Sequence, residues 1–164
     1  MSYDSRPETY EHIGRVAHFM HVVIVRLIGR IEKHDQTKLS GMEKEAFDIV
    51  TPRLAEIEYG SEEYKASLRE IRPAIDEHYR HNSHHPEHYE NGIAGMNLLD
   101  LIEMLCDWRA ASERGKPRAE AKDGERAGES SSLLGSLDHN VERFDIEPQL
   151  ASVLRNTIME MEWS

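Results

Sequence analysis

Apolar residues recur at steps of three and four along almost the whole chain, which is the spacing of α-helices that bury one face. The first such pattern runs from Glu8 to Lys33 and predicts one long amphipathic helix. Its apolar positions are Ile13, Val16, Met20, Val23, Leu27 and Ile31. No stretch of useful length alternates apolar and polar residues, so strands are not predicted. We therefore expect an all-α fold, a bundle of about five to seven helices.

Local signals divide the rest of the chain into further helices. Ser40 and Glu43 have the spacing of a capping box, with Ser40 as the N-cap and Glu43 reaching back to it. The Tyr-Gly-Ser segment at 59–61 ends that helix and starts another, which Pro73 should kink or split. Asn97 is placed to cap a helix with a strong apolar stripe over 98–111. A last apolar pattern, over 146–161, predicts a final helix that packs back on the bundle.

Residues 115–132, GKPRAEAKDGERAGESSS, are rich in glycine, serine and charge and offer almost nothing to bury. Such a composition is typical of a flexible loop. The residues beyond it are too few to fold alone. We therefore expect a single domain over residues 1–164, with a flexible loop at 115–132.

The net charge of the chain limits the classes of partner that it can bind. The formal net charge is −11 with histidine neutral, and such a field repels nucleic acid duplexes and anionic membranes. Cys106 is the single cysteine, which excludes an internal disulfide and favours a reducing compartment. The N-terminus lacks the pattern of a secretory signal, and no apolar run approaches the roughly 20 residues needed to cross a bilayer. A cytoplasmic protein is expected.

Histidine is concentrated in the stretch HYRHNSHHPEH, residues 78–88, which holds five of the ten histidines. The stretch is too polar for a core and lies between well-patterned helices. His34 and Asp35 form a vicinal pair, and three acids share one face of the 98–111 helix: Asp100, Glu103 and Asp107. Imidazole and carboxylate ligands suit Fe, Mn, Zn, Co or Mg, whereas the lack of cysteine pairs argues against a structural zinc site.

Each of these features also has an ordinary explanation. A His-Asp dipeptide arises often by chance, and the acids of the 98–111 helix suit a solvated face. His18 and His21 fit packing or surface positions on the first helix, and His81 and His88 fit solvated ones. Metal binding explains all the features together, including a carboxylate at Asp107 that would be costly to bury without a partner.

An early helical histidine, a His-Asp pair and a later helical aspartate resemble the HD-domain superfamily of metal-dependent phosphohydrolases. The histidines of HHPEHYENG are similar to those of the HD-GYP branch, although the Gly-Tyr-Pro tripeptide is absent, since Ile-Ala-Gly follows Gly92. The resemblance implies an HD-domain-like helical bundle that holds one or two divalent metal ions. The ligands it implies are His12, His34, Asp35, His78, His84, His85 and Asp107.

A second resemblance covers nearly the whole chain except the 115–132 loop. The run HHPEHYENGI…MNLLDLIEMLCDWRAA, with YGSEEY before it and NVERF after it, resembles a family of small bacterial and phage proteins of unknown function. This resemblance concerns the candidate site and leaves the activity open.

The HD-domain resemblance implies hydrolysis of a nucleotide or another small phosphate ester. In that reaction Asp35 would orient the attacking water and Lys38 would offset charge on the transferring phosphoryl group. Arg80 and Arg109 are the candidates for substrate binding. The implied partner is a small phosphorylated molecule, and a homodimer is kept open.

Two other functions fit the same residues. Some HD-fold proteins hold a diiron centre and oxidise a C–H bond with O₂, and the ligand types do not separate that chemistry from hydrolysis. A non-catalytic binding protein clamped by its metal is the other alternative, which a fully coordinated ion would favour.

Overall fold

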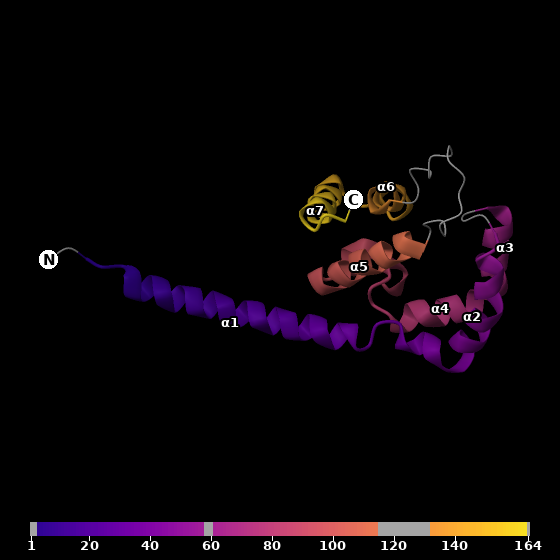
Figure 1. Cartoon of the computed structure of the whole chain (residues 1–164), viewed down its shortest axis with the longest axis horizontal. Coiled ribbons are helices and arrows are strands. Elements are labelled where there is room, and N and C mark those ends of the chain that lie inside the picture. The colour runs from indigo at the N-terminus through magenta and orange to yellow at the C-terminus, as the bar shows by residue number, and fades with distance from the viewer. Residues whose placement is uncertain (1–2, 58–60, 115–131, 164) are drawn as a thin grey trace.

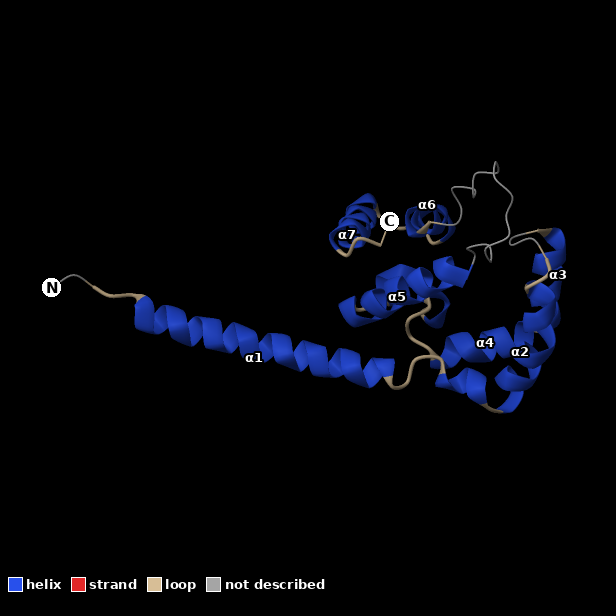
Figure 2. Ribbon diagram, in the orientation of Figure 1, coloured by secondary structure: helices blue, strands red, loops and turns tan. Residues whose placement is uncertain are grey.

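The computed structural model describes residues 3–57, 61–114 and 132–163. Within these ranges it contains seven α-helices, three short 3₁₀ helices and no strand, so the predicted all-helical fold is confirmed (Figures 1 and 2). The α-helices are α1 (Arg6–Ile31), α2 (Gly41–Leu54), α3 (Glu62–Glu70), α4 (Arg72–His81), α5 (Leu98–Arg114), α6 (Leu133–Arg143) and α7 (Pro148–Glu160). The 3₁₀ helices are η1 (Gln36–Leu39), η2 (Pro86–His88) and η3 (Gly92–Gly95).

Helix α1 projects away from the other helices, and only its C-terminal end approaches them (Figure 1). Its bounds lie within two residues of the predicted ones, but the expected burial of its apolar stripe is not found. None of its residues is buried. Ile13 is 55% exposed and Met20 is 61% exposed. Most of the circumference of α1 is therefore exposed to solvent.

The hydrophobic core lies between α5, α6 and α7. Its buried members are Met104, Leu105, Leu133, Leu137, Ile146, Leu154 and Ile158. At the edge of this core, the Trp108 ring stacks on the ring of Phe144, with ring centroids 6.4 Å apart. The predicted final helix is therefore confirmed as α7, which packs against α6. This core fixes one face of α5 and leaves the opposite face, with its three acids, for α1 and the 82–85 loop.

The other predicted helix boundaries have mixed outcomes. Pro73 lies in the first turn of α4 and separates it from α3 at Ile71, as expected. Asn97 caps α5, because its side-chain oxygen accepts hydrogen bonds from the backbone amides of Leu99 and Asp100. Ser40 is the N-cap residue of α2, as predicted, but the capping box with Glu43 was wrong. Ser40 precedes α2 without a side-chain hydrogen bond, because the carboxylate of Glu43 is directed into the interior instead.

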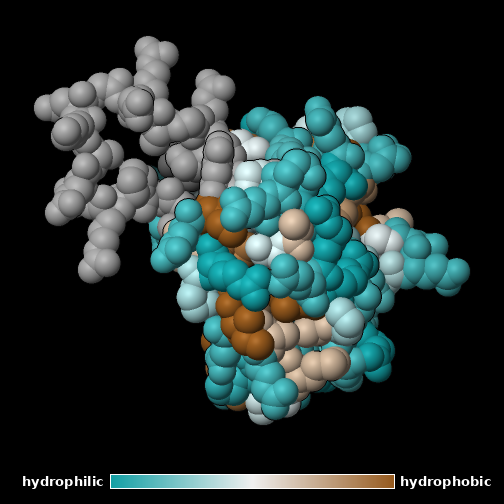
Figure 3. Space-filling view, turned by 90° about the vertical axis from the view of Figure 1, so that its right-hand side faces the viewer, coloured by the Kyte–Doolittle hydropathy of each residue, from teal (hydrophilic) through white to brown (hydrophobic). Residues whose placement is uncertain are grey.

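The predicted 115–132 loop lies outside the described residues, apart from Ser132, whose hydroxyl accepts a hydrogen bond from the amide of Gly135 at the start of α6. The single-domain organisation stays a prediction. Seen from the end that carries α2, α3 and α4, the surface is mainly hydrophilic, with hydrophobic side chains at several places, most of them in its lower half (Figure 3). None of the described helices combines the length and the apolar character needed to cross a bilayer.

Candidate metal centre

The His34-Asp35 pair lies in the turn that follows α1. The amide of His34 donates to the carbonyl of Arg30 at 2.8 Å, which continues the last turn of the helix. Asp35 then adopts a left-handed conformation with φ 55°, and η1 begins at the next residue. Few residues other than glycine adopt this conformation, and aspartate is among those that tolerate it. The turn brings both side chains to α5 and to the 82–85 loop.

A first group of ligand atoms surrounds one oxygen of Asp35. Asp35 Oδ1 lies 3.3 Å from His78 Nε2 and 3.6 Å from His84 Nε2. His85 Nε2 lies 2.9 Å from His78 Nε2. The four residues offer one ligand atom each within 4.8 Å of one another. His78 comes from the last turn of α4, and His84 and His85 follow it in the loop.

A second group shares Asp35 with the first. His34 Nε2 lies 3.8 Å from Asp35 Oδ2 and 3.8 Å from Asp107 Oδ1. These three residues also satisfy the distance limit for one ion. Asp107 is on α5, one turn after Glu103. The two oxygens of Asp35 are thus directed to different groups, which is the arrangement of a carboxylate that bridges two ions.

Two buried polar atoms at the centre support metal binding. Asp35 Oδ1 and His84 Nε2 are both buried, and neither has a hydrogen-bond partner among the described residues. Leaving such atoms unpaired costs about 1–3 kcal/mol each, and more for a charged group. A divalent ion between them would satisfy both atoms at once. The residues present therefore fit a metal ion, and the cluster could hold one.

Carboxylates behind the histidines set the direction of their rings. Glu43 Oε2 lies 2.9 Å from His78 Nδ1. Glu103 Oε1 lies 2.9 Å from His34 Nδ1 and 3.1 Å from His84 Nδ1. A carboxylate can only accept, so with a metal ion bound Nδ1 of each ring would carry the proton and Nε2 would present its lone pair to the ion. Three of the four imidazoles are therefore prepared as metal ligands.

An ion-pair network holds the other oxygen of Glu103, Oε2. Arg30, near the end of α1, donates to Glu103 Oε2 at 2.7 Å and to Asp100 Oδ1 at 2.6 Å. Asp100 is fully buried and also accepts from the hydroxyls of Ser83 and Tyr89. The network joins α1, α5 and the 82–85 loop. It therefore fixes the segments that carry or directly precede five of the six clustered residues, all except His78 on α4.

The electrostatics of the site keep its carboxylates ionised. Burial alone would raise the pKa of Asp35, but the contacts with His78 and Lys38 hold that pKa well below its usual range. Burial also works against ionised Glu103, yet hydrogen bonds from His34, His84 and Arg30 lower its pKa. Burial, reinforced by the neighbouring His84 and His78, lowers the pKa of His85 to about 2. His85 is therefore a neutral imidazole at physiological pH, as a metal ligand must be.

Six of the seven ligands predicted from the sequence meet in this cluster, and His12 does not. His12 is exposed on α1, eighteen residues before Arg30, which corresponds to about 27 Å along the helix axis. The helix points away from the cluster over that distance (Figure 1). A straight helix that touches α5 only at its end cannot bring both ends to one site.

The other predicted residues divide between the centre and the surface. Lys38 Nζ lies 2.7 Å from Asp35 Oδ2, next to the cluster. Arg80 is exposed on α4 and pairs with Glu77. Arg109 donates to the carbonyl of Trp163 at 3.3 Å, on the side of α5 that faces the C-terminal segment. The structure therefore does not bring either arginine to the cluster.

Glu43 and Arg30 support the cluster but were not singled out from the sequence, and Glu103 was noted only as one of three acids on a helix face. Glu103 had a signal, because it shares a helix face with Asp107 at a spacing of four residues. Glu43 was assigned to a capping box, and nothing in its local sequence indicates a contact with His78, which is 35 residues away. Arg30 resembles any other charged residue at the end of a helix.

Replacing Glu43 with glutamine should weaken metal binding about 10- to 100-fold, because the amide no longer fixes the Nδ1 proton of His78 as a carboxylate does. The measurement is a competition titration against a chelating dye. Glu45 is exposed on the same helix, so Glu45→Gln is the matched control and should bind metal as the wild type does. Equal affinity of the two variants would show that Glu43 has no influence on the centre.

Residues 1–160 match the model of a family of unknown function (DUF5662). The match spans almost the whole chain, and the chain belongs to this family. No curated protein and no solved structure matches it.

Proposed function

We propose that this protein is a metal-dependent phosphohydrolase that acts on a nucleotide or another small phosphate ester. The observation that carries the proposal is the sharing of Asp35 between two ligand groups, one of three histidines and one of His34 and Asp107. Two divalent ions bridged by a carboxylate suit phosphate-ester hydrolysis, because they can contact both the attacking and the leaving oxygen.

The HD-domain resemblance supports the same chemistry. His34, Asp35 and Asp107, which matched its motif, lie together, and so do the three histidines that matched the HD-GYP branch. His12 is the departure. Its absence from the cluster leaves the second group with one imidazole and two carboxylates.

The chain's own residues have definite tasks in this proposal. His34, Asp35 and Asp107 would hold one ion, and His78, His84 and His85 would hold the other together with Asp35. A divalent ion would supply polarisation of the phosphoryl oxygens and a lowered pKa of bound water. Lys38 pairs with Asp35 Oδ2 at 2.7 Å and keeps a positive charge beside the site of reaction. In the reaction the water oxygen bonds to phosphorus as the ester P–O bond breaks, and the alcohol leaves with a proton from the water.

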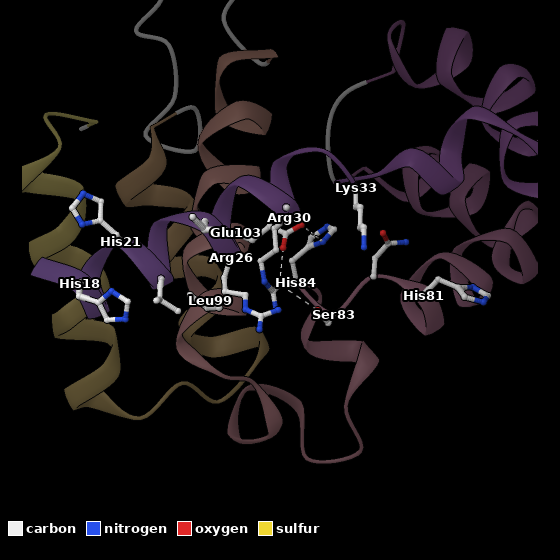
Figure 4. Close-up of a pocket in the computed structure, with 14 residues that line it drawn as sticks. His18, His21, Arg26, Arg30, Lys33, His81, Ser83, His84, Leu99 and Glu103 are labelled. Carbon is white, nitrogen blue, oxygen red and sulfur yellow. Dashed lines mark hydrogen bonds and ion pairs between the residues drawn. The ribbon is translucent and has the colours of Figure 1, made fainter. Parts of the chain in front are cut away.

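A cavity next to the cluster favours an enzyme over a protein in which the metal ion is fully enclosed and only structural. His84 and Glu103 line a cavity of about 800 Å³ between α1 and the 82–85 loop (Figure 4). Small-molecule sites commonly have volumes of about 300–1,000 Å³. A ligand could therefore reach one edge of the cluster from this side.

The proposal predicts phosphate release from a generic aryl phosphate in the presence of Mn²⁺, Co²⁺ or Fe²⁺. Asp35→Asn should abolish the activity, because both groups lose a ligand charge. Lys38→Met should lower kcat at least tenfold with metal content unchanged, since it removes one charge at the reacting phosphoryl. His139 is exposed on α6, and His139→Ala serves as the control.

Metal analysis of protein purified without a histidine tag separates the alternatives. Bound metal without phosphate release across nucleotides and aryl phosphates contradicts the proposal. Two irons per chain with oxygen consumption would then identify the oxygenase. A tightly held ion that exchanges with no added ligand would identify the clamp.

A further inference from the structure

The cavity beside the candidate metal centre is lined by three cations and one acidic residue, in a chain that is acidic overall. The cations are Arg26 and Arg30 on α1 and Lys33 in the turn that follows it, and the one acidic residue is Glu103. Glu103 is already engaged by Arg30 and two histidines. In a chain of net charge −11, such a lining selects for an anion.

Two of these cations form no ion pair with any residue that the structure describes. Arg30 is held by Asp100 and Glu103, and most other described arginines and lysines also form ion pairs. Among residues whose side chains are described, Arg26, Lys33 and Arg69 are the arginines and lysines that form neither a close ion pair nor a side-chain hydrogen bond, and Arg69 lies near enough to Glu62 to lower its pKa. Arg26 and Lys33 line the same cavity, and both are directed into the space between α1 and the 82–85 loop (Figure 4).

The two ends of the cavity are lined by different kinds of side chain. Lys33 is next to His34 at the cluster, and Arg26 is two helical turns away, about 10 Å along the axis. Beyond Arg26, the lining changes to apolar and imidazole side chains, those of Val22, Val25, Leu99, His18 and His21. One end therefore suits phosphoryl groups and the other suits a flat, partly apolar group.

We propose that this cavity binds a nucleoside polyphosphate, with its phosphate chain along Lys33 and Arg26 and its base at the His18–His21 end. This inference rests on the proposed function, because it places the terminal phosphoryl group at the metal centre beside His84. A single phosphate would engage only one of the two cations, so the site discriminates in favour of two or more phosphoryl groups. Arg26 and Lys33 are binding residues in this arrangement.

Isothermal titration with α,β-methylene-ADP, AMP and adenosine tests the inference. The diphosphate analogue should bind at least tenfold more tightly than AMP, and adenosine weakest. Arg26→Ala and Lys33→Ala should each weaken binding of the analogue about tenfold or more, because each removes a charged hydrogen-bond donor. Arg69→Ala, at the third cation without a close ion pair, lies outside the cavity and should have no effect.

Gly29→Leu provides a second test that does not depend on charge. Gly29 lines the cavity, and a Cβ atom placed on it meets no other atom within 4 Å. Leucine also favours the helix more than glycine does, so this variant should fold at least as well as the wild type. Its side chain should occupy the cavity and reduce analogue binding at least tenfold, with metal content unchanged.

The outcomes separate this inference from the proposed function. Equal affinities for AMP and the analogue, or unaltered binding in the Arg26, Lys33 and Gly29 variants, overturn the cavity assignment and leave the metal centre unaffected. Conversely, absence of phosphate-ester hydrolysis together with charge-dependent analogue binding overturns the proposed function and supports the cavity assignment.

The opposite face of α1 carries a separate, independent feature. Seven apolar residues recur at alternating steps of three and four, which is the heptad spacing of a coiled coil. We call them the α1 seam: Tyr10, Ile13, Ala17, Met20, Ile24, Leu27 and Ile31. Five of them are large side chains at least 49% exposed. The α1 seam is offset by about half a helical turn from the face that lines the cavity.

We infer that the α1 seam pairs with the same helix of a second copy of this chain. It extends over about 33 Å of helix. Two such seams packed together would bury on the order of 1,200 Å², the lower end for a stable interface. An antiparallel pair places the two sets of remaining helices at opposite ends, where they do not collide.

Light scattering on the purified full chain at micromolar concentrations tests this pairing. The wild type should be a dimer, and Ile24→Glu combined with Leu27→Glu should be a monomer with unchanged metal content. Val25→Glu introduces the same charge on α1 outside the seam and should remain dimeric. A monomeric wild type, or a protein that associates only with lipid vesicles through this face, overturns the inference.

Discussion

Replacing His84 with alanine is expected to remove at least one metal ion from each chain. His84 is buried, its Nε2 atom has no hydrogen-bond partner among the described residues, and the atom faces Asp35 Oδ1 at 3.6 Å. Loss of an outer partner alone weakens metal sites 10- to 100-fold, so loss of this ligand should weaken the affinity by more than about 100-fold. Elemental analysis of the purified variant gives the result directly.

His12→Ala is the informative companion to this variant. The sequence motif made His12 a ligand, whereas the structure places it on the exposed part of α1. It should therefore retain the metal content of the wild type. A His12 variant that loses metal as completely as the His84 variant would show that the arrangement of α1 described above is not the one that binds metal.

Thermal unfolding with and without a chelator gives a second measurement of the same centre. A ligand that binds only the folded state at 100 times its Kd stabilises it by about 2.7 kcal/mol. The chelator should therefore lower the Tm of the wild type and of His12→Ala, and leave that of His84→Ala unchanged. An unaltered wild-type Tm would contradict a bound metal.

Asp100→Asn is expected to be the most destabilising single change near the centre, by about 3–5 kcal/mol, as when one partner of a buried ion pair is removed. Asp100 is fully buried and contacts Arg30 at 2.6 Å. It also accepts hydrogen bonds from Ser83, Tyr89 and the amide of Asn97. Its removal uncouples α1 and the 82–85 loop from α5. Chemical denaturation measures the change.

Asp76→Asn is the matched control for this prediction. Asp76 pairs with Arg72 at 2.7 Å, but both side chains are largely exposed. Exposed pairs contribute about 0–1 kcal/mol, so the control should unfold almost as the wild type does. Similar effects of the two variants would contradict the structural role given to Asp100.

The difference between the wild type and Asp100→Asn should also depend on pH. Burial opposes ionisation of Asp100, but the hydrogen bonds from Asn97, Ser83, Tyr89 and Arg30 lower its pKa. A lowered folded-state pKa stabilises the protein above the unfolded value of about 3.9. That stabilisation is lost as the pH falls through the folded pKa. The difference in unfolding free energy should therefore narrow on acidification below about pH 4.

Local sequence was sufficient to predict the main helices and some of the residues of the candidate metal centre. The apolar periodicity gave α1, α5 and α7, and Pro73 and Asn97 marked helix boundaries, because these signals act over a few residues. The histidines of 78–88 could be singled out because polar clustering between helices is itself unusual. His34, Asp35 and Asp107 came from a motif and not from any local rule.

Only the tertiary structure decided which residues reach the centre. The sequence by itself determined a helical chain with a metal-suited set of histidines and acids. It did not reveal that α1 projects from the other helices, so it wrongly gave α1 a buried stripe. It also could not pair Glu43 with His78, or Arg30 with Asp100 and Glu103, which lie 35, 70 and 73 residues apart. Such contacts depend on how separate helices cross, and that is set by the packing of the whole fold rather than by the residues on either side.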